Sequence, residues 1–127
     1  MIRHATEADL PWMLAAAKAK QEWLGVGSFD HDYTADVWRQ SRVLTDGTGQ
    51  LWGCEMPSTT SPDPALNCVL FWESDRNAWP LLKAHESSSD LPSAVFVPSK
   101  HERQEALMRA LRIRGYEPHE TLMVKHG

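Results

Sequence analysis

The sequence has 127 residues, a length that suits one domain with a substantial hydrophobic core and leaves no room for a second. Hydrophobic residues make up 42% and charged residues 24% of the chain, which is ordinary for a soluble globular protein. No apolar run approaches the roughly 20 residues that a membrane helix requires. We therefore expect a single domain over residues 1–127 that makes no contact with a membrane.

Charge and the N-terminal residues narrow the function classes further. The formal net charge of -4 argues against a general nucleic-acid binder, because affinity for phosphate backbones depends on clustered Lys and Arg. The five Lys and Arg residues from Lys100 to Arg114 are better explained as the solvated face of a helix. The N-terminus MIRHATEADL alternates charged and small residues where an export signal needs an apolar segment, so we expect a cytoplasmic protein.

Neither the cysteines nor the histidines suggest a metal site. Cys54 and Cys68 are far apart and lack a CxxC partner, and in a chain without an export signal such residues are usually small buried hydrophobes. The segment FDHD, Phe29 to Asp32, clusters one histidine with two carboxylates, but no matching His or Cys pair is recognisable elsewhere. We interpret it as a capping loop and expect no bound metal.

The N-terminal half predicts one short strand and two helices. Residues 2–5 are extended, and residues 6–23 then follow the helical period, with a cap at Thr6 or Asp9. The apolar face of this first helix is formed by Leu10, Met13, Leu14 and Ala17. Residues 33–44 predict a shorter second helix that is capped by Thr34 or Asp36. Its apolar side would carry Val37, Trp38, Ser41 and Leu44.

The middle of the chain predicts strands separated by turns. Residues 46–49, DGTG, have turn chemistry, residues 50–56 read as a strand, and the proline-rich residues 57–64 read as a loop. The most strand-like run is ALNCVLFWES, residues 65–74, whose nearly continuous apolar character suits a strand covered on both faces. Residues 78–86 give at most two helical turns, and residues 93–99 give another buried strand.

The C-terminal part predicts an amphipathic helix over residues 99–115, with Ser99 as N-cap and Gly115 just past its end. Its inward residues would be Leu107, Ala110 and Leu111, and residues 116–126 close the chain as extended structure. A strand, a helix and a second strand in succession imply parallel pairing of those strands. The expected fold class is therefore α/β, with a mixed, partly parallel central sheet flanked by helices.

Both ends of the chain resemble the GNAT superfamily of N-acetyltransferases. Members commonly open with Ile-Arg-x-Ala-Thr-x-x-Asp-Leu-Pro, which is matched by Ile2, Arg3, Ala5, Thr6, Asp9, Leu10 and Pro11. They close with a helix, a Gly-aromatic pair and a strand ending near Met-x-Lys, matched by Gly115, Tyr116, Met123 and Lys125. The stretch RGYEPHETLMVK is particularly similar to compact GNAT-like proteins of bacteriophages. These motifs span the chain and imply the GNAT fold more than its chemistry.

The resemblance implies an acetyl-CoA site at the turn after residues 65–74. In the family, backbone N–H groups of a Gln/Arg-x-x-Gly-x-Gly/Ala turn hold the pyrophosphate, and glycines let the backbone approach it closely. Here Arg76 keeps the first position, whereas Trp79 and Leu81 fill the two small ones and Pro80 has no N–H. The implied cofactor-binding residues are Phe71, Trp72, Arg76, Asn77, Ala78 and Trp79.

The same resemblance implies a base, because an amine with a pKa near ~10.4 is protonated at neutral pH. GNAT enzymes often use a carboxylate on the strand before the phosphate-binding turn, and they polarise the thioester carbonyl with an N–H of that strand. Glu73 is the catalytic candidate, Glu55 is the second choice, and the alternative for Glu73 is a solvent-facing residue at a strand end. The tyrosine that often serves as the family's acid falls on Leu111, and Tyr116 is expected in the core.

Two functions remain open on the sequence. The first is acetyl transfer from acetyl-CoA to an amine acceptor, favoured by Arg76 and by the family motifs at both ends. The second is a catalytically inactive GNAT-fold protein that binds a protein partner or serves as a structural component, for example in a phage virion. The glycine-free turn and the missing tyrosine favour the second.

Overall fold

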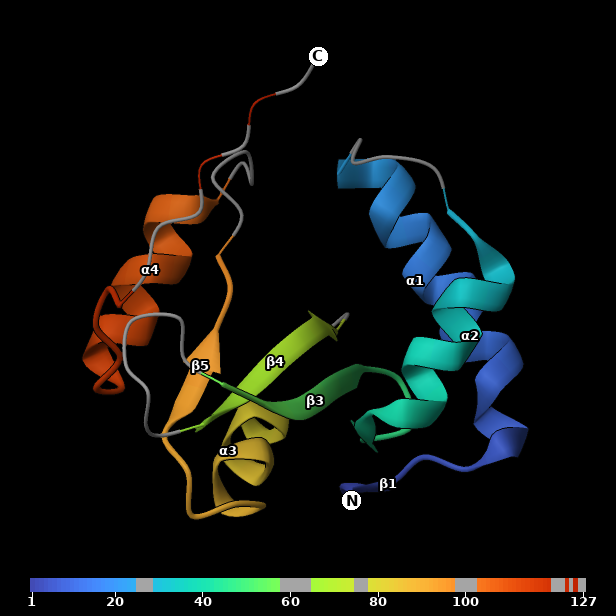
Figure 1. Cartoon of the computed structure of the whole chain (residues 1–127), viewed down its shortest axis with the longest axis horizontal. Coiled ribbons are helices and arrows are strands. Elements are labelled where there is room, and N and C mark those ends of the chain that lie inside the picture. Colours follow the sequence, from blue (N-terminus) through green and yellow to red (C-terminus); the bar gives the residue numbers. More distant parts are fainter. Residues whose placement is uncertain are drawn as a thin grey trace.

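Five strands form one sheet in the order β1-β2-β3-β4-β5. The computed structural model describes residues 1–24, 29–57, 65–74, 78–97, 103–119, 123 and 125, with the backbone alone for residues 21–24. The strands are β1 (Arg3–His4), β2 (Arg42–Thr45), β3 (Gln50–Pro57), β4 (Ala65–Glu73) and β5 (Ser93–Val95). Neighbours from β1 to β4 pair antiparallel, and β5 runs parallel to β4 (Figure 1). The predicted α/β class with a mixed, partly parallel sheet is confirmed.

Helices cover both faces of this sheet. α1 (Leu10–Leu24) and α2 (His31–Gln40) pack on one face, and α3 (Trp79–Ser87) and α4 (Gln104–Ile113) pack on the other. Side chains alternate along β3, so Leu51 joins the core under α3 and α4 whereas Trp52 joins the core under α1 and α2. In Figure 1 the pair α1 and α2 stands on the opposite side of the molecule from α4. No helix in the described part of the chain is both long and apolar enough to cross a membrane.

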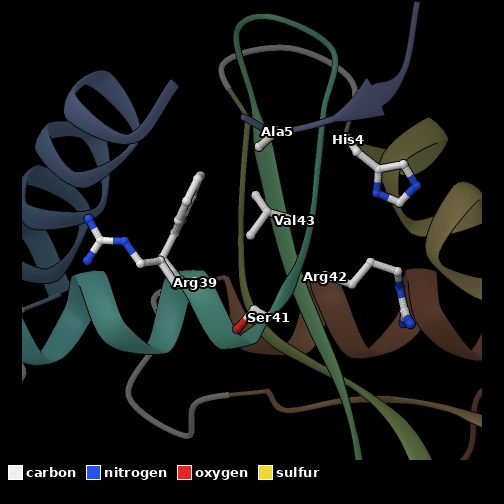
Figure 2. A pocket seen from close by; sticks show the side chains of 7 residues that line it. His4, Ala5, Arg39, Ser41, Arg42 and Val43 are labelled. Atoms are coloured by element: carbon white, nitrogen blue, oxygen red, sulfur yellow. The ribbon is translucent and has the colours of Figure 1, made fainter. Parts of the chain in front are cut away.

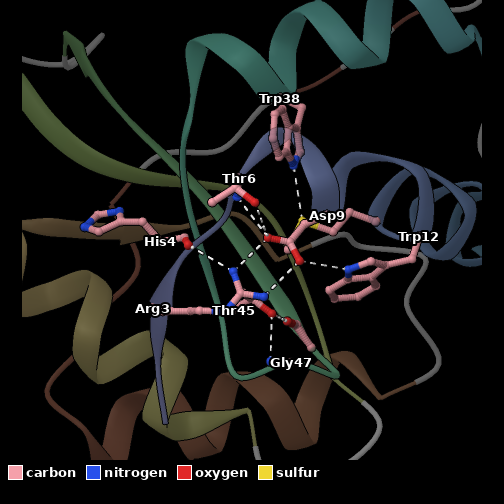
Figure 3. Close-up of polar contacts among 10 residues, drawn as sticks. Arg3, His4, Thr6, Asp9, Trp12, Trp38, Thr45 and Gly47 are labelled. Atoms are coloured by element: carbon pink, nitrogen blue, oxygen red, sulfur yellow. Dashed lines mark hydrogen bonds and ion pairs between the residues drawn. The ribbon is translucent and has the colours of Figure 1, made fainter.

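The chain start is fixed by an ion pair between Arg3 and Asp9. The guanidinium of Arg3 donates to both carboxylate oxygens of Asp9, at 2.7 and 2.8 Å. Asp9 also accepts from the backbone N–H of Thr6 at 2.9 Å and from the indole of Trp12 at 3.1 Å (Figure 3). This capping box precedes a 3-10 turn, η1 (Glu7–Asp9), and the predicted buried face of α1 follows it.

The second helix differs from its prediction at both ends. It begins earlier, because Asp30 accepts a hydrogen bond from the N–H of Tyr33 at 2.9 Å and thus caps it, in place of Thr34 or Asp36. The FDHD segment is therefore a cap, as expected. The helix ends at Gln40, and the predicted helical residues 42–44 belong to β2 instead. Four residues are too few to separate a period of 3.6 from a period of 2.

The turn agrees with its prediction, and the last helix ends where predicted but begins later. Between β2 and β3, Asp46 accepts from the N–H groups of Thr48 and Gly49, which closes the DGTG turn. After α4, Gly115 takes a positive φ of 93° and ends the helix as a C′ glycine. α4 begins at Gln104 with Arg103 as its N-cap, so the predicted start with Ser99 as N-cap is wrong. Ser99 itself lies outside the described residues, and so does most of the predicted last strand. The described residues 116–119 form no strand.

Candidate active site

The last part of β4 diverges from β5. The two strands pair only through residues 67–69 and 93–95, although β4 continues to residue 73. A shift of register at Trp52/Gly53 leaves Leu70 as an extra residue on β4, which is a β-bulge. Bulges bend a strand and re-aim its side chains, and they recur beside active sites. Within the described residues, positions 70–73 therefore have no strand partner on the β5 side.

Glu73 ends β4 and is half-buried, so it is not simply a solvent-facing residue. It lies directly opposite Gln50 on β3, and the Gln50 amide nitrogen donates to the Glu73 carboxylate at 3.2 Å. Gln50 itself is fully buried and bonds to the indole of Trp52 at 2.7 Å and to the carbonyl of Met13 at 3.0 Å. The carboxylate is thus attached to the core under α1.

The second carboxylate candidate, Glu55, lies at the other end of β3 from the residue that faces Glu73. Glu55 is exposed, lies opposite Asn67 in the register, and accepts from the hydroxyl of Ser89 at 3.4 Å. Because Gln50 pairs with Glu73, Glu55 stands five positions further along β3, at the end where β4 begins. The structure does not bring the two candidates together.

The aromatic candidates lie on both sides of β4. Phe71 packs against the core under α1 and α2, where its ring centroid lies 5.1 Å from that of Trp52. Trp72 points to the other face, and its ring meets Trp79 edge-on at 5.3 Å. The guanidinium of Arg114 stacks over Trp79 at 3.5 Å, a cation–π contact. Trp79, one of the implied cofactor-binding residues, is half-buried between these two groups.

The turn that follows β4 is described only in part. Arg76 and Asn77 lie outside the described residues, and Ala78 is the N-cap of α3 without a side-chain hydrogen bond. The N–H groups of Leu81 and Leu82 bond to the carbonyl of Ala78, and Pro80 has no N–H. A phosphate at this helix start would therefore depend on the amides of Ala78 and Trp79, together with the turn before them.

Tyr116 and Leu111 are structural. Leu111 is buried in the core under α3 and α4, and Tyr116 packs against that core, as expected. The Tyr116 hydroxyl contacts Glu86 at 2.6 Å and Ser93 at 2.7 Å. Burial and the neighbouring Glu86 carboxylate raise the pKa of Tyr116 well above its ordinary value. The tyrosine therefore stays protonated and ties α3 to β5.

Sequence reasoning missed a buried polar cluster on the α3 face. His85 is fully buried, and its Nε2 lies 2.9 Å from the carbonyl of Asn67, whose amide donates to the carbonyl of His85 at 2.9 Å. Arg42 donates to the Asn67 side chain, and His85 sits so close to Gly53 that a Cβ there would lie 2.8 Å from Nδ1. The spacing of Leu81, Leu82 and His85 on one helical face was the available signal.

The cysteines are closer than their sequence positions suggest. Cys54 and Cys68 lie opposite each other on β3 and β4, both as free thiols. Cys68 is buried, as predicted, and Cys54 is half-buried. Burial raises the pKa of the Cys54 thiol, so Cys54 does not resemble an activated nucleophile. No group of three metal-ligating side chains occurs among the described residues.

A small hollow of about 170 Å³ lies between β1, β2 and the end of α2, away from the predicted site residues. Figure 2 shows its basic side chains pointing apart, with His4 and Arg42 on one side of β2 and Arg39 on the other. Arg39 bonds to Glu7 at 3.1 Å, and Arg42 is bonded to Asn67. The hollow is not a converging anion site.

Comparison with solved structures identifies the fold. The chain resembles a possible acetyltransferase from Clostridium difficile 630, with a TM-score of 0.69, 13% identity, and coverage of 100% of this chain and 97% of the other. It also resembles an aminoglycoside acetyltransferase from an uncultured soil metagenomic sample, in complex with sisomicin, with a TM-score of 0.65, 14% identity, and coverage of 100% and 96%. The chain has the GNAT acetyltransferase fold.

The resemblance is carried by structure rather than by sequence. A trehalose complex of the same aminoglycoside acetyltransferase matches with a TM-score of 0.59 and 14% identity, over 100% of this chain and 94% of the other. No protein-family model and no curated protein sequence matches. At such identities the likeness establishes the GNAT fold alone, so residue roles have to be argued from the geometry of this chain.

Proposed function

We propose that this protein is an N-acetyltransferase that moves an acetyl group from acetyl-CoA to an amine acceptor, with Glu73 as the base. The observation that carries the proposal is the Glu73 carboxylate, which ends β4 beyond its pairing with β5 and is bonded to the buried amide of Gln50. The GNAT fold supports acetyl transfer, and a neighbour that acts on aminoglycosides supports an amine acceptor.

The residues around the start of α3 fit the phosphates of CoA in charge and, less fully, in hydrogen bonding. The N-terminus of a helix favours anions, and the Arg114 guanidinium lies beside the first residue of α3. Ala78 and Trp79 would contribute amides, and Arg76 and Asn77 remain predicted contacts from the sequence. Phe71 and Trp72 belong to the part of β4 along which the acyl arm would lie, one on each face of the strand.

Bound acetyl-CoA would supply an activated acyl group whose thiolate leaves readily. An amine is protonated at neutral pH and must lose a proton before it can attack. Glu73 would accept that proton at a carboxylate oxygen, while a backbone N–H of β4 beyond the β5 pairing would donate to the acyl oxygen. With Leu111 in the position of the family's tyrosine, the leaving thiolate would take its proton from water.

The test is calorimetric titration with acetyl-CoA, followed by release of free CoA thiol in the presence of a panel of amines that includes sisomicin. We expect saturable binding in the micromolar range and turnover with at least one amine. Glu73→Gln should lower kcat by roughly 10²-fold or more while acetyl-CoA still binds, because the variant keeps the shape and loses the base.

Glu55→Gln is the matched control, since Glu55 is exposed and lies five positions along β3 from the residue opposite Glu73. Its kcat should equal that of the wild type. Equal activity of Glu73→Gln and wild type would refute the role of Glu73. A protein that binds no acetyl-CoA at millimolar ligand would refute acetyl transfer altogether and direct the search to a protein partner.

A further inference from the structure

Gln50 is a polar side chain placed where the core under α1 meets the candidate active site. It is fully buried and lies opposite Glu73 in the register of β3 against β4. Its amide makes three hydrogen bonds: one accepted from Trp52, one donated to Met13 and one donated to Glu73. A buried amide that bonds this extensively loses conformational freedom, so it has one orientation.

The three partners also fix which way the amide faces. The indole N–H of Trp52 can only donate, and the carbonyl oxygen of Met13 can only accept. A flipped amide would place its NH2 group against the Trp52 N–H and its oxygen against the Met13 oxygen. Both Trp52 and Met13 are buried in the core under α1 and α2, which holds them in place. The NH2 group of Gln50 therefore points at Glu73.

We propose that Gln50 is a positioning residue for the reaction: its amide fixes the Glu73 carboxylate at the end of β4 and keeps it ionised. This inference rests on the proposed role of Glu73 as the base. An N–H donated to a carboxylate favours the charged form and orients one of its oxygens. The base then starts each turnover in one orientation, in the charged form that can accept a proton.

The groups that orient Gln50 carry no charge of their own. Gln50, Trp52 and Met13 are uncharged, so their effect on the carboxylate comes from hydrogen bonding and burial. On α1, Lys20 follows Met13 by seven residues and hence occupies the same side of the helix. Lys20 is present in every variant considered below, so its charge cancels when the variants are compared.

The experiment compares Gln50→Met, which keeps the length of the side chain and removes the donor, with wild-type protein. In the free protein, the ¹³C titration of the Glu73 carboxyl should move to higher pH in the variant. In turnover, kcat should fall about tenfold with the KM for acetyl-CoA unchanged, and the acid limb of the pH profile of kcat/KM should move to higher pH. The shifts count only in a variant that still unfolds cooperatively, because loss of fold would also remove the hydrogen bond and move the titration upwards.

Two further variants keep the test decisive. Gln50→Asn shortens the side chain by one methylene and keeps a polar group. It should show the same pH shifts, and it replaces Gln50→Met in the test if that variant fails to fold. Asn67→Leu removes another fully buried amide of the same sheet, one that bonds to His85 and not to Glu73. It should leave the Glu73 titration unchanged.

Different results would contradict the positioning role of Gln50 and the proposed function. An unchanged Glu73 titration in both Gln50 variants, or an unchanged kcat, would overturn the positioning role even in an active enzyme. A wild-type protein without transfer activity would overturn the proposed function, and with it the catalytic meaning of the pair. The carboxyl titration separates these cases, because it measures the hydrogen bond in the free protein without requiring activity.

Discussion

The ionisation of the Asp9 carboxylate is controlled by the groups that donate hydrogen bonds to it. Asp9 accepts from the Arg3 guanidinium, the Thr6 backbone and the Trp12 indole (Figure 3). The hydrogen bonds from Arg3 are the largest cause that holds the pKa of Asp9 well below its ordinary value of 3.8, and the bonds from Thr6 and Trp12 act in the same direction. The carboxylate therefore stabilises the folded state only while it is ionised.

Asp9→Asn should lower the thermal unfolding midpoint at pH 7, because the charge that joins β1 to the start of α1 is lost. The folded-state pKa is depressed, so this contribution is complete above the unfolded pKa and disappears as the pH falls towards the folded one. The difference between variant and wild type should therefore shrink below about pH 4. Thermal unfolding at pH 7 and pH 3 measures it, with the exposed Asp90→Asn as control. A difference that stays constant with pH would contradict the assignment.

Residue type and position predicted Glu73 but not its partner. A carboxylate directly after an apolar strand could be singled out from the sequence, and its role as the base stays a prediction. Gln50 could not be predicted, because its contact with Glu73 depends on the register of two strands joined by a loop. Sequence patterns identify strands more readily than they identify which residues of two strands face each other.

At the scale of elements, the cap of α2 gives a direct comparison between prediction and structure. The sequence offered Thr34 or Asp36, whereas the structure shows Asp30 accepting from the N–H of Tyr33. Asp30→Ala should lower the free energy of unfolding by about 0.5–2 kcal/mol, the usual cost of losing an N-cap. Urea denaturation would measure the change. Asp36→Ala on the same helix is the control, and an equal loss in both variants would argue against a cap at Asp30.

The boundary between α2 and β2 shows why elements are harder to delimit than to detect. Leu44 was predicted on the apolar face of a helix, but Val43 and Leu44 point to opposite faces of the sheet and join different cores. Ser41 ends the helix, and its hydroxyl donates to the carbonyl of Val37 at 2.6 Å. Only pairing with β1 and β3, which the local sequence does not encode, makes residues 42–45 a strand.

For the whole molecule, the chain order of elements and the motifs at its two ends sufficed to predict the fold class. The strand, helix and strand that became β4, α3 and β5 required a crossover and hence parallel pairing, which the structure confirms. The divergence of β4 from β5 was not predicted, because a bulge at Leu70 depends on tertiary pairing. The proposed chemistry uses this divergence, since residues 70–73 of β4 lie beyond the pairing with β5.

The response of the whole molecule to mild acid should be governed by His85. Burial lowers the pKa of His85 below its ordinary value of 6.5, and the nearby positive charge of Arg42 acts in the same direction. Because the unfolded chain binds a proton that the folded one resists, the free energy of unfolding should fall as the pH drops through 6.5. The slope should not exceed about 1.4 kcal/mol per pH unit for this one group.

His85→Gln isolates this effect, since glutamine does not titrate and its amide can still donate to the carbonyl of Asn67. Urea denaturation of both proteins between pH 7 and pH 5 should show wild-type stability falling while the variant stays level over the same range. Below pH 4, where Asp9 becomes protonated in the unfolded chain, both proteins should lose stability together. Parallel curves from pH 7 to pH 5 would mean that His85 accepts its proton without cost, and that the cluster with Arg42 and Asn67 is open to water.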